Sequence, residues 1–393
     1  MKEQRIKLLD DVMIDILKRL PAKSLIIFKC VSKTWYSLIS SPDFIYIHYN
    51  YDSLSHQFIF LKRYLKIEES TESIYYNGKH MLSFHSNDES FKSIAPSIEY
   101  LDNYIGVNIA GPCNGIVCIA SYRGFVLFNP TLREFWELPP SILPTNTNLS
   151  PSKDLYCQVG MTMGIGFDTD TNDYKVVRIL NPAHEYEFED FYNHDLYVSK
   201  VEVYNLSTNC WRKLEDLECI IESLRCCHVL FNTAYHWNAY IKSAGSCIIS
   251  FNFSTESFQK HLYPEGVANT RRASLFVLNQ TLAMICFSEN YPPDVLVLQS
   301  IDIWVMKKYC VRESWIKEFT IGPLLIKAPL SVWKNDAELM IECEEGKLVS
   351  CNLLSQAMKD LHMSSVPDTL EGFVCKQSLI SIKKRETSDP YLF

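Results

Sequence analysis

The sequence predicts a mainly β chain that begins with a small α-helical module. In the first fifty residues, apolar side chains recur every three or four positions, which is the spacing of one helix face. From about Gln57 onward this period disappears. Short apolar and aromatic runs then alternate with Asn, Asp, Ser, Thr, Gly and Pro, a pattern typical of many short strands. Aromatic residues, which favour strands, make up 13% of the chain.

The length of 393 residues suits a module of residues 1–50 followed by a β domain of residues 51–393. The start of the chain lacks the pattern of a secretory signal, and no stretch approaches the ~18–20 apolar residues that span a bilayer. The 14 Cys are scattered among apolar neighbours, as is usual for reduced, buried thiols. We expect a soluble protein of the cytosol, with the nucleus as a second location, and no membrane partner.

The charge is distributed unevenly. Residues 1–50 hold eight Lys or Arg against five Asp or Glu, a net of +3, so the remaining residues carry −11 of the total of −8. A negative β domain argues against nucleic acid as a partner, because Lys and Arg drive phosphate binding. It is compatible with a basic protein partner, and equally with a surface whose acidity only aids solubility.

The N-terminal module is expected to contain three short helices. The first ends at Pro21, because the residue before a proline is pushed out of the α region. A second follows over residues 22–30, and Ser32 is a good N-cap for a third, which Pro42 stops. Three such helices bury too little surface to be stable alone. Their surplus of large apolar residues predicts a surface that a partner covers.

The β domain contains a weak internal repeat: a strand, a turn that begins with Asn, and a strand opened by a large apolar residue. Asn suits the turn because its side chain can bond the backbone two residues on. We expect the large apolar residues to be structural core positions. The pairs are Asn129 with Trp136, Asn205 with Trp211, Asn252 with Phe258, and Asn352 with Met358, and residues 303–305 with Trp315 form a longer hairpin of the same kind.

The spacing of the repeat predicts the architecture. The turn Asn residues lie 76, 47 and 100 positions apart, and the hairpin near Trp304 divides the last interval, so the period is near 50 residues. That length is typical of a four-stranded, kelch-like propeller blade. A further blade closes if residues 58–61 pair with residues 373–374 and 379–382, which leaves no open edge. We predict about six four-stranded units, with a β-sandwich as the alternative.

The longest interval of the repeat contains an acidic, aromatic segment. Such an insertion would project from one rim of a propeller, where carboxylates attract a basic protein and aromatic rings anchor it. An exposed loop whose acidity only aids solubility is the other interpretation. The candidate substrate-binding residues are Glu185, Glu187, Glu189, Asp190, Phe191 and Tyr192.

Patterns that carry chemistry are weak in this chain. The glycine-rich residues 160–166 lack the Lys and the strand-to-helix context of a phosphate loop, so we interpret them as strand turns. The triplet Cys226-Cys227-His228 has no second ligand pair at metal spacing. We therefore expect no catalytic, cofactor-binding or metal-binding residues. A propeller-based enzyme and a plain binding scaffold are the other two classes of function.

The module resembles the plant F-box motif in the order and spacing of residues 20–25 (LPAKSL), 28–35 (FKCVSKTW), 38–39 and Phe44. It departs from that pattern at Leu9, where the family usually has Pro, and at Ile27, where it often has Arg. In that family the motif binds a Skp-type adaptor, which attaches to a cullin scaffold and a RING subunit. The resemblance implies these adaptor-binding residues: Leu8, Ile16, Leu17, Leu20, Pro21, Leu25, Val31 and Trp35.

The β domain resembles the F-box-associated domain of plant F-box proteins, through residues 111–118, 128–133, 166–168, 173–178 and 313–315. Residues 303–309 and 329–334 are most similar to S-locus F-box and S-locus-F-box-like proteins. The resemblance implies a non-catalytic subunit of an SCF-type (Skp–cullin–F-box) ubiquitin ligase whose β domain selects the protein to be degraded. For the S-locus members that target is a basic secreted ribonuclease in pollen self-incompatibility. A paralogue with another target, such as a defence regulator, and a non-degradative scaffold are the alternatives.

Overall fold

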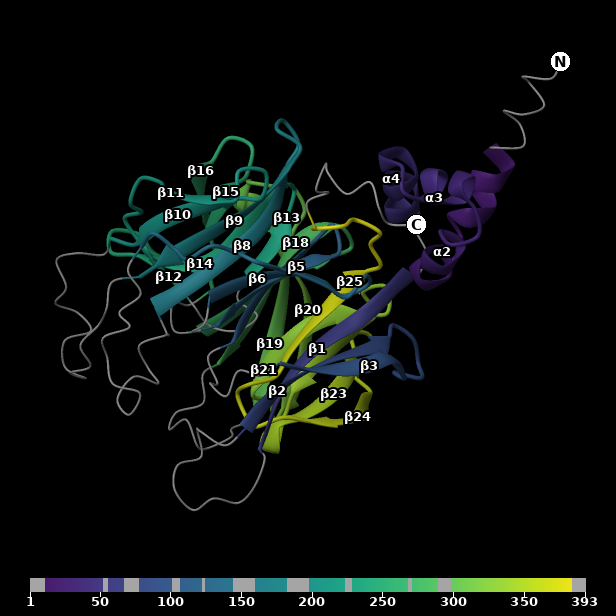
Figure 1. Cartoon of the computed structure of the whole chain (residues 1–393). Helices are drawn as coiled ribbons and strands as arrows, with labels where there is room; N and C mark the ends of the chain where they lie inside the picture. Colours follow the sequence, from purple (N-terminus) through teal and green to yellow (C-terminus); the bar gives the residue numbers. More distant parts are fainter. Residues whose placement is uncertain are drawn as a thin grey trace.

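The computed structural model describes residues 11–51, 56–66, 78–100, 107–121, 124–143, 160–181, 198–222, 228–267, 271–288 and 298–383. Within these ranges the chain forms a helical module at its N-terminal end and six antiparallel β-sheets arranged as the blades of a propeller (Figure 1). The predicted propeller is therefore confirmed, and the β-sandwich alternative is wrong.

The module contains four short helices, where the sequence predicted three. Ser32 caps the third helix as expected, and its Oγ accepts the backbone N–H of Trp35 at 3.2 Å. Pro42 does lie beyond the end of that helix, but it also begins a fourth one, because proline is tolerated at the first helical position. Ser41 caps this helix through the N–H of Phe44. The helices are residues 11–17, α2 (Ala22–Phe28), α3 (Lys33–Ile39) and α4 (Pro42–Asn50).

Each blade has four strands side by side, and the strand nearest the propeller axis is called the first strand of its blade. In blade 4 the first strand consists of two pieces. Blade 1 contains β25 (Glu371–Lys376), β1 (Gln57–Lys66), β2 (Gly78–Ser86) and β3 (Ser93–Tyr100). Blade 2 contains β4 (Asn108–Cys113), β5 (Ile116–Ser121), β6 (Gly124–Asn129) and β7 (Glu134–Glu137), and blade 3 contains β8 (Met161–Asp168), β9 (Asp173–Leu180), β10 (Lys200–Asn205) and β11 (Cys210–Lys213). Blade 4 contains β12 (Ile220–Ile221), β13 (His228–Phe231), β14 (Ala234–Ile241), β15 (Gly245–Asn252) and β16 (Ser257–Leu262). Blade 5 contains β17 (Arg271–Leu278), β18 (Thr281–Ser288), β19 (Gln299–Met306) and β20 (Trp315–Leu324), and blade 6 contains β21 (Ala328–Trp333), β22 (Glu338–Glu342), β23 (Lys347–Asn352) and β24 (Met358–Ser364).

Blade 1 joins the two ends of the propeller chain. The predicted pairing of residues 58–61 with residues 373–374 is confirmed, since β1 pairs antiparallel with β25 and Phe60 lies opposite Phe373. Two positions along this register, Lys62 lies opposite Glu371. Nζ of Lys62 donates to Oε1 of Glu371 at 2.5 Å, and both side chains are buried. A charged pair in this position ties the first strand of the propeller to the last.

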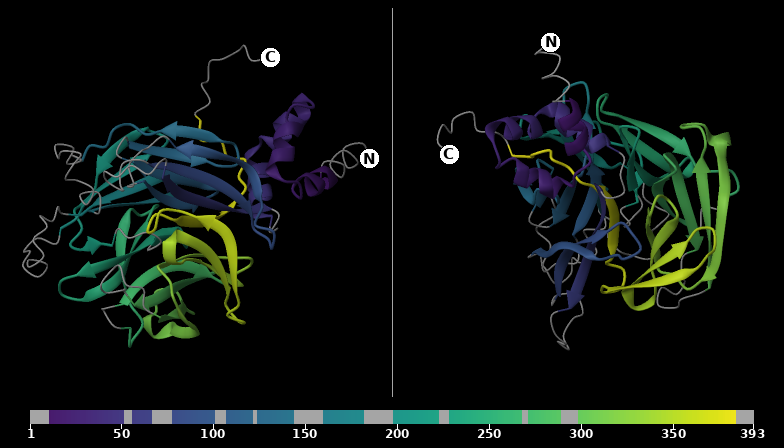
Figure 2. Two further views of the ribbon diagram at one scale, coloured as in Figure 1. Left: turned by 90° about the horizontal axis from the view of Figure 1, so that it is seen from below. Right: turned by 90° about the vertical axis from the view of Figure 1, so that its right-hand side faces the viewer.

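The predicted strand over residues 379–382 is wrong. After β25 the chain leaves the sheet, and residues 377–382 run alongside the helices of the module and across blade 2 (Figure 2, right). We call residues 377–382 the C-terminal strap. Leu379 of the strap is buried in the apolar core of the helical module, and Ile382 is buried in the core shared by blades 2, 3 and 4.

The repeated hairpins form the two outer strands of blades 2 to 6, as predicted. Oδ1 of Asn129 accepts the backbone N–H groups of Thr131 and Leu132, and Asn252 and Asn352 make the same kind of turn. The large apolar residues after these turns differ in burial. Trp211 and Trp315 are buried, Trp136 and Phe258 are partly buried against the core, and Met358 is exposed.

Residues 161–166 of the glycine-rich stretch lie along one strand, β8, and not in turns between strands, and Gly160 comes directly before that strand. Two of these glycines let blades 3 and 4 approach closely. A Cβ added to Gly164 would lie 2.7 Å from the ring of Tyr235, and one added to Gly166 would overlap the ring of Phe253. The glycines therefore make room for aromatic rings of the neighbouring blade, which is a packing role and not a phosphate-binding one.

Candidate functional site

The helical module has its own apolar core. Leu17, Leu25, Ile39 and Phe44 are buried together with Ala22, and the core is completed by Leu379 of the C-terminal strap. The rings of Phe28 and Trp35 meet edge to face with centroids 5.2 Å apart. The side chains that hold the helices together are thus distinct from those that point outward.

Large apolar residues are exposed on all four helices and in the turn after α2. Ile16 is 56% exposed and Val31 is 65% exposed. Exposed apolar side chains in this number, on a module whose core is already filled, make the outside of the module a candidate protein-binding site. The complete set in the described part of the module is Val12, Ile16, Ile27, Val31, Tyr36, Tyr46 and Ile47.

Seven of the eight residues predicted to bind an adaptor are described, and they fall into three groups. Ile16, Pro21 and Val31 are exposed, whereas Leu20 and Trp35 are partly buried against the module core. Leu17 and Leu25 are 1% and 0% exposed, so they support the surface from within. Leu8 lies outside the described residues. Sequence reasoning left out exposed Ile27, which had counted only as a departure from the motif, and exposed Tyr36.

The propeller has two unlike rims. At one, the module rim, short turns join the first strand of a blade to the second, for example residues 114–115 and 169–172. The helical module joins the propeller here, where β1 begins and β25 ends (Figures 1 and 2). At the opposite rim, the far rim, lie the connections from second to third strands and between blades. The described strand ends at this rim flank seven ranges that are outside the described residues: 67–77, 101–106, 122–123, 144–159, 182–197, 268–270 and 289–297.

The predicted acidic segment, Glu185 to Tyr192, lies outside the described residues, in the far-rim connection between β9 and β10. The two ends of this connection are hydrogen-bonded to blade 4 and to the residues that directly precede β12. Nδ2 of Asn181 donates to the carbonyl of Ile221 at 2.7 Å, and the N–H of Ser199 donates to the carbonyl of Leu217 at 2.8 Å. Three exposed carboxylates are in the same short stretch as these partners: Glu215, Asp216 and Glu218.

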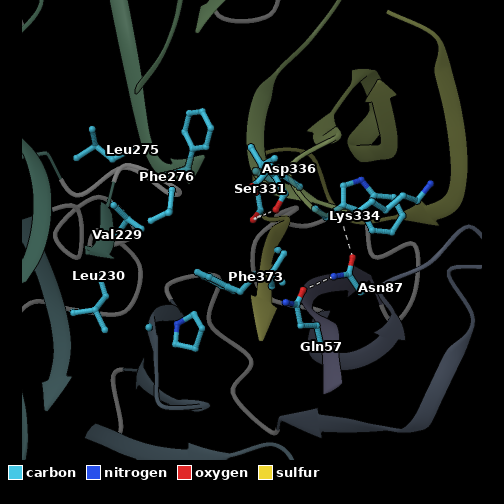
Figure 3. Close-up of a pocket in the computed structure, with 18 of the residues that line it drawn as sticks. Gln57, Asn87, Val229, Leu230, Leu275, Phe276, Ser331, Lys334, Asp336 and Phe373 are labelled. Carbon is cyan, nitrogen blue, oxygen red and sulfur yellow. Dashed lines mark hydrogen bonds between the residues drawn. The ribbon is translucent and has the colours of Figure 1, made fainter. Parts of the chain in front are cut away.

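A cavity of about 350 Å³ lies at the centre of the propeller, between the inner strands of the blades (Figure 3). Leu275, Phe276 and Phe373 contribute apolar surface, and Gln57 and Asn87 contribute polar groups. The side-chain amide of Asn87 donates to Oε1 of Gln57 at 2.8 Å and accepts the N–H of Lys334 at 3.1 Å. These polar groups are therefore engaged in holding blades 1 and 6 together.

His228 lines the same cavity, and its protonation state follows from its partners. The hydroxyl of Tyr235 accepts the N–H of Gly111 at 3.0 Å and lies 2.9 Å from Nδ1 of His228. This hydrogen bond is compatible with a neutral imidazole, whichever of the two atoms donates. Burial lowers the pKa of His228, which agrees with a neutral ring. Cys226 and Cys227 lie outside the described residues.

A histidine–serine contact in blade 4 is buried. Nε2 of His261 lies 2.7 Å from Oγ of Ser250, but both residues are buried between blade strands. The described residues contain no group of three or more His, Cys, Asp or Glu that could hold a metal ion. No helix among the described residues is long and apolar enough to cross a membrane. The accessible candidate surfaces are thus the apolar face of the module and the far rim.

Comparison with known protein families agrees with this division of the chain. Residues 7–46 match the F-box domain, and residues 95–369, more than half of the chain, match the F-box associated beta propeller domain. The F-box match spans α2 and α3 and ends within α4.

Curated relatives from Arabidopsis thaliana match over most of their length. "F-box protein CPR1" is 26% identical over 94% of this chain and 88% of its own length. "F-box/kelch-repeat protein At3g23880" is 28% identical over 87% of each chain. "F-box protein At3g07870" is 24% identical over 91% of this chain and 88% of its own. The chain is a plant F-box protein and belongs to the F-box associated β-propeller family.

Proposed function

We propose that this protein is the substrate-binding subunit of an SCF-type ubiquitin ligase. Residues 1–50 bind a Skp-type adaptor and, through it, a cullin–RING ligase, while residues 51–393 bind the protein to be ubiquitinated and degraded. The subunit has no catalytic role, no cofactor and no nucleic-acid or membrane partner. The observation that carries the proposal is the set of exposed apolar residues on a helical module whose own core is already full.

Within the module, the adaptor contacts belong to two layers. Ile16, Pro21 and Val31 are exposed and touch the adaptor directly, and partly buried Leu20 and Trp35 contribute their accessible edges. Leu17 and Leu25 act through the helices that they hold in place. Leu8, outside the described residues, belongs to the proposed contact because of its place in the motif. Burying exposed apolar area at a rate of ~25 cal/mol per Å² supplies the main driving force for such a complex.

The substrate binds at the far rim, through the segment that contains Glu185, Glu187, Glu189, Asp190, Phe191 and Tyr192. Two observations support this: the described ends of the long connection between β9 and β10 lie at this rim, and exposed Glu215 and Glu218 flank Leu217, whose carbonyl accepts the N–H of Ser199 at one of those ends. Acidic side chains favour a basic protein partner by raising its rate of encounter.

A basic ribonuclease is the target proposed from the resemblance to S-locus F-box proteins, and the site of action is then the cytosol, with the nucleus as a second location. The second candidate is a paralogous receptor for another intracellular protein, such as a defence regulator. A non-degradative scaffold is the third. The three differ in what accumulates when the protein is removed: a ribonuclease, another single protein, or none.

The adaptor half of the proposal can be tested with exposed residues alone. Ile16→Asp together with Val31→Asp places charge in the proposed contact, which costs ~3 kcal/mol or more if the surface is desolvated on binding. Affinity purification of the full chain from plant tissue should then lose adaptor and cullin together. Leu354→Asp is the matched control, because Leu354 is equally apolar and exposed but lies on blade 6. Undiminished recovery of the adaptor with the double variant would contradict the proposal.

A further inference from the structure

We infer that the C-terminal strap is a positioning element, which fixes the helical module relative to the propeller and thereby fixes which region of a bound protein faces the ligase. This inference rests on the proposed function. Domains joined by a single linker move relative to one another by default. Here the strap gives the module a second attachment, made by chain that has already completed the propeller.

On the module side the strap supplies both an apolar and a polar contact. Leu379 is 2% exposed and lies in the same core as Leu25 and Phe44. Oε1 of Gln377 accepts the N–H of Ala22, the first residue of α2, at 2.7 Å. α2 has no side-chain cap from its own N-cap residue, so the strap satisfies one of its free N–H groups.

On the propeller side the strap is bound along blade 2. Nδ2 of Asn129 donates to the carbonyls of Ser378, at 3.2 Å, and Ile380, at 2.7 Å. Oε2 of Glu134 accepts the N–H of Ile382 at 3.1 Å, and Ile382 is buried in the blade core. Asn129 also forms the turn between β6 and β7, so the strap is held by a rigid hairpin.

Gly115 shows how closely the strap approaches the propeller. It has φ +78° in the turn between β4 and β5, and a Cβ added there would lie 2.5 Å from Cβ of Ser378 and 2.6 Å from the carbonyl oxygen of Lys376. A side chain at this position would push the strap away. Gly266 has a similar φ of +84°, but an added Cβ meets nothing within 4 Å.

The linker between α4 and β1 joins the same junction. Nε2 of His48 donates to the carbonyl of Leu20, and Nε2 of His56 donates to the carbonyl of Arg19. The two imidazoles stack with centroids 4.8 Å apart. His56 also accepts the N–H of Gln377 on its carbonyl at 2.7 Å. α4, His56 of the linker, the strap and residues 19–20 after the first helix are thus joined by hydrogen bonds and ring stacking.

The experiment compares the full chain with Leu379→Ala, which weakens the module side, and Gly115→Ala, which weakens the propeller side. Gly266→Ala is the control, because it imposes the same backbone strain without touching the strap. Hydrogen exchange and small-angle X-ray scattering are measured on the free chain. Both strap variants should exchange about tenfold faster or more in residues 377–382 and α2, because local opening governs exchange. The distribution of interatomic distances from their X-ray scattering should broaden. The backbone amides of β8 and β14 should stay protected from hydrogen exchange.

The functional readout is the pattern of self-ubiquitination in a reconstituted complex with adaptor, cullin and RING subunit. Wild type and Gly266→Ala should be modified at the same restricted set of propeller lysines, and the strap variants at a wider set with adaptor binding retained. Unchanged scattering and an unchanged lysine pattern in both strap variants would overturn the inference. Failure of the wild type to bind the adaptor would instead reject the proposed function, and the free-chain measurements would still decide the role of the strap.

Discussion

The N–H of Ala22 and the side-chain carbonyl of Gln377 form a hydrogen bond of 2.7 Å between residues 355 positions apart. Ala22 begins a helix of the F-box, and Gln377 follows the last strand of the propeller. The two domains are therefore joined by a contact between distant parts of the chain as well as by the linker between them. The F-box is packed against residues that are reached only after the propeller has been traversed.

The close packing of blades 3 and 4 leads to a stability prediction. Gly166→Ala should lower the free energy of unfolding by about 1–3 kcal/mol, because the added methyl group overlaps the ring of Phe253 and the blades must separate. Gly160→Ala is a matched control at the start of the same stretch, where an added Cβ would lie 3.5 Å from its nearest neighbour. Urea unfolding measures both. Equal midpoints for the two variants would show that the blades tolerate the extra volume.

A buried histidine between blades 4 and 5 leads to a prediction on pH. Burial lowers the pKa of His236 to about 3, with a smaller contribution from His261, and Nε2 of His236 lies 2.9 Å from the hydroxyl of Tyr309. The unfolded chain titrates at the ordinary value of 6.5, so below that pH it binds a proton that the folded chain does not. The free energy of unfolding should fall as pH decreases from about 6.5 towards 3, by at most about 1.4 kcal/mol per pH unit for this residue.

The check on this prediction is His236→Gln, which removes the titrating group. Urea unfolding at several pH values should show a smaller loss of stability on acidification for this variant than for the wild type. His362→Gln, at a residue whose side chain is 87% exposed, is the control and should follow the wild type. Parallel pH profiles for wild type and His236→Gln would mean that the folded chain accepts the proton.

The proposed acidic contact leads to a prediction on association kinetics. Glu185→Gln, Glu187→Gln, Glu189→Gln and Asp190→Asn together should slow the association of a basic ribonuclease several-fold at low salt, because long-range attraction raises the encounter rate. The difference should vanish near 1 M salt, where the Debye length is ~3 Å. Surface-based binding measures the rates. Identical rates at low salt would move the substrate site to other far-rim connections.

The sequence was sufficient for the propeller because its repeat is local. One hairpin is indicated by a turn Asn with an apolar residue six or seven positions later, and hairpins at a regular spacing indicate blades. The same reasoning failed at residues 379–382. Leu379 and Ile382 are buried as a strand residue would be, but one contacts the helical module and the other the blade core. Apolar patterning predicts that a side chain is buried, but it does not predict which helix or strand the side chain packs against.

The fourth helix was missed for a related reason. Pro42 ends one helix and begins another, and a proline alone is compatible with both. The preceding Ser41 was the informative residue, because a serine before proline is a good N-cap. In the module surface, the resemblance to the F-box motif implied Leu17 and Val31 alike as adaptor-binding positions, but only the packing of four helices decides that Leu17 is covered and Val31 exposed.

Closure of blade 1 by β25 has a consequence for protein synthesis. The F-box leaves the ribosome first, yet its core lacks Leu379 and its neighbouring blade lacks an inner strand until nearly the whole chain has been translated. Chains cut short before residue 371 can neither complete the propeller nor fill the module core. If the proposed adaptor contact requires the filled module core, such fragments would bind the adaptor more weakly than the finished chain does.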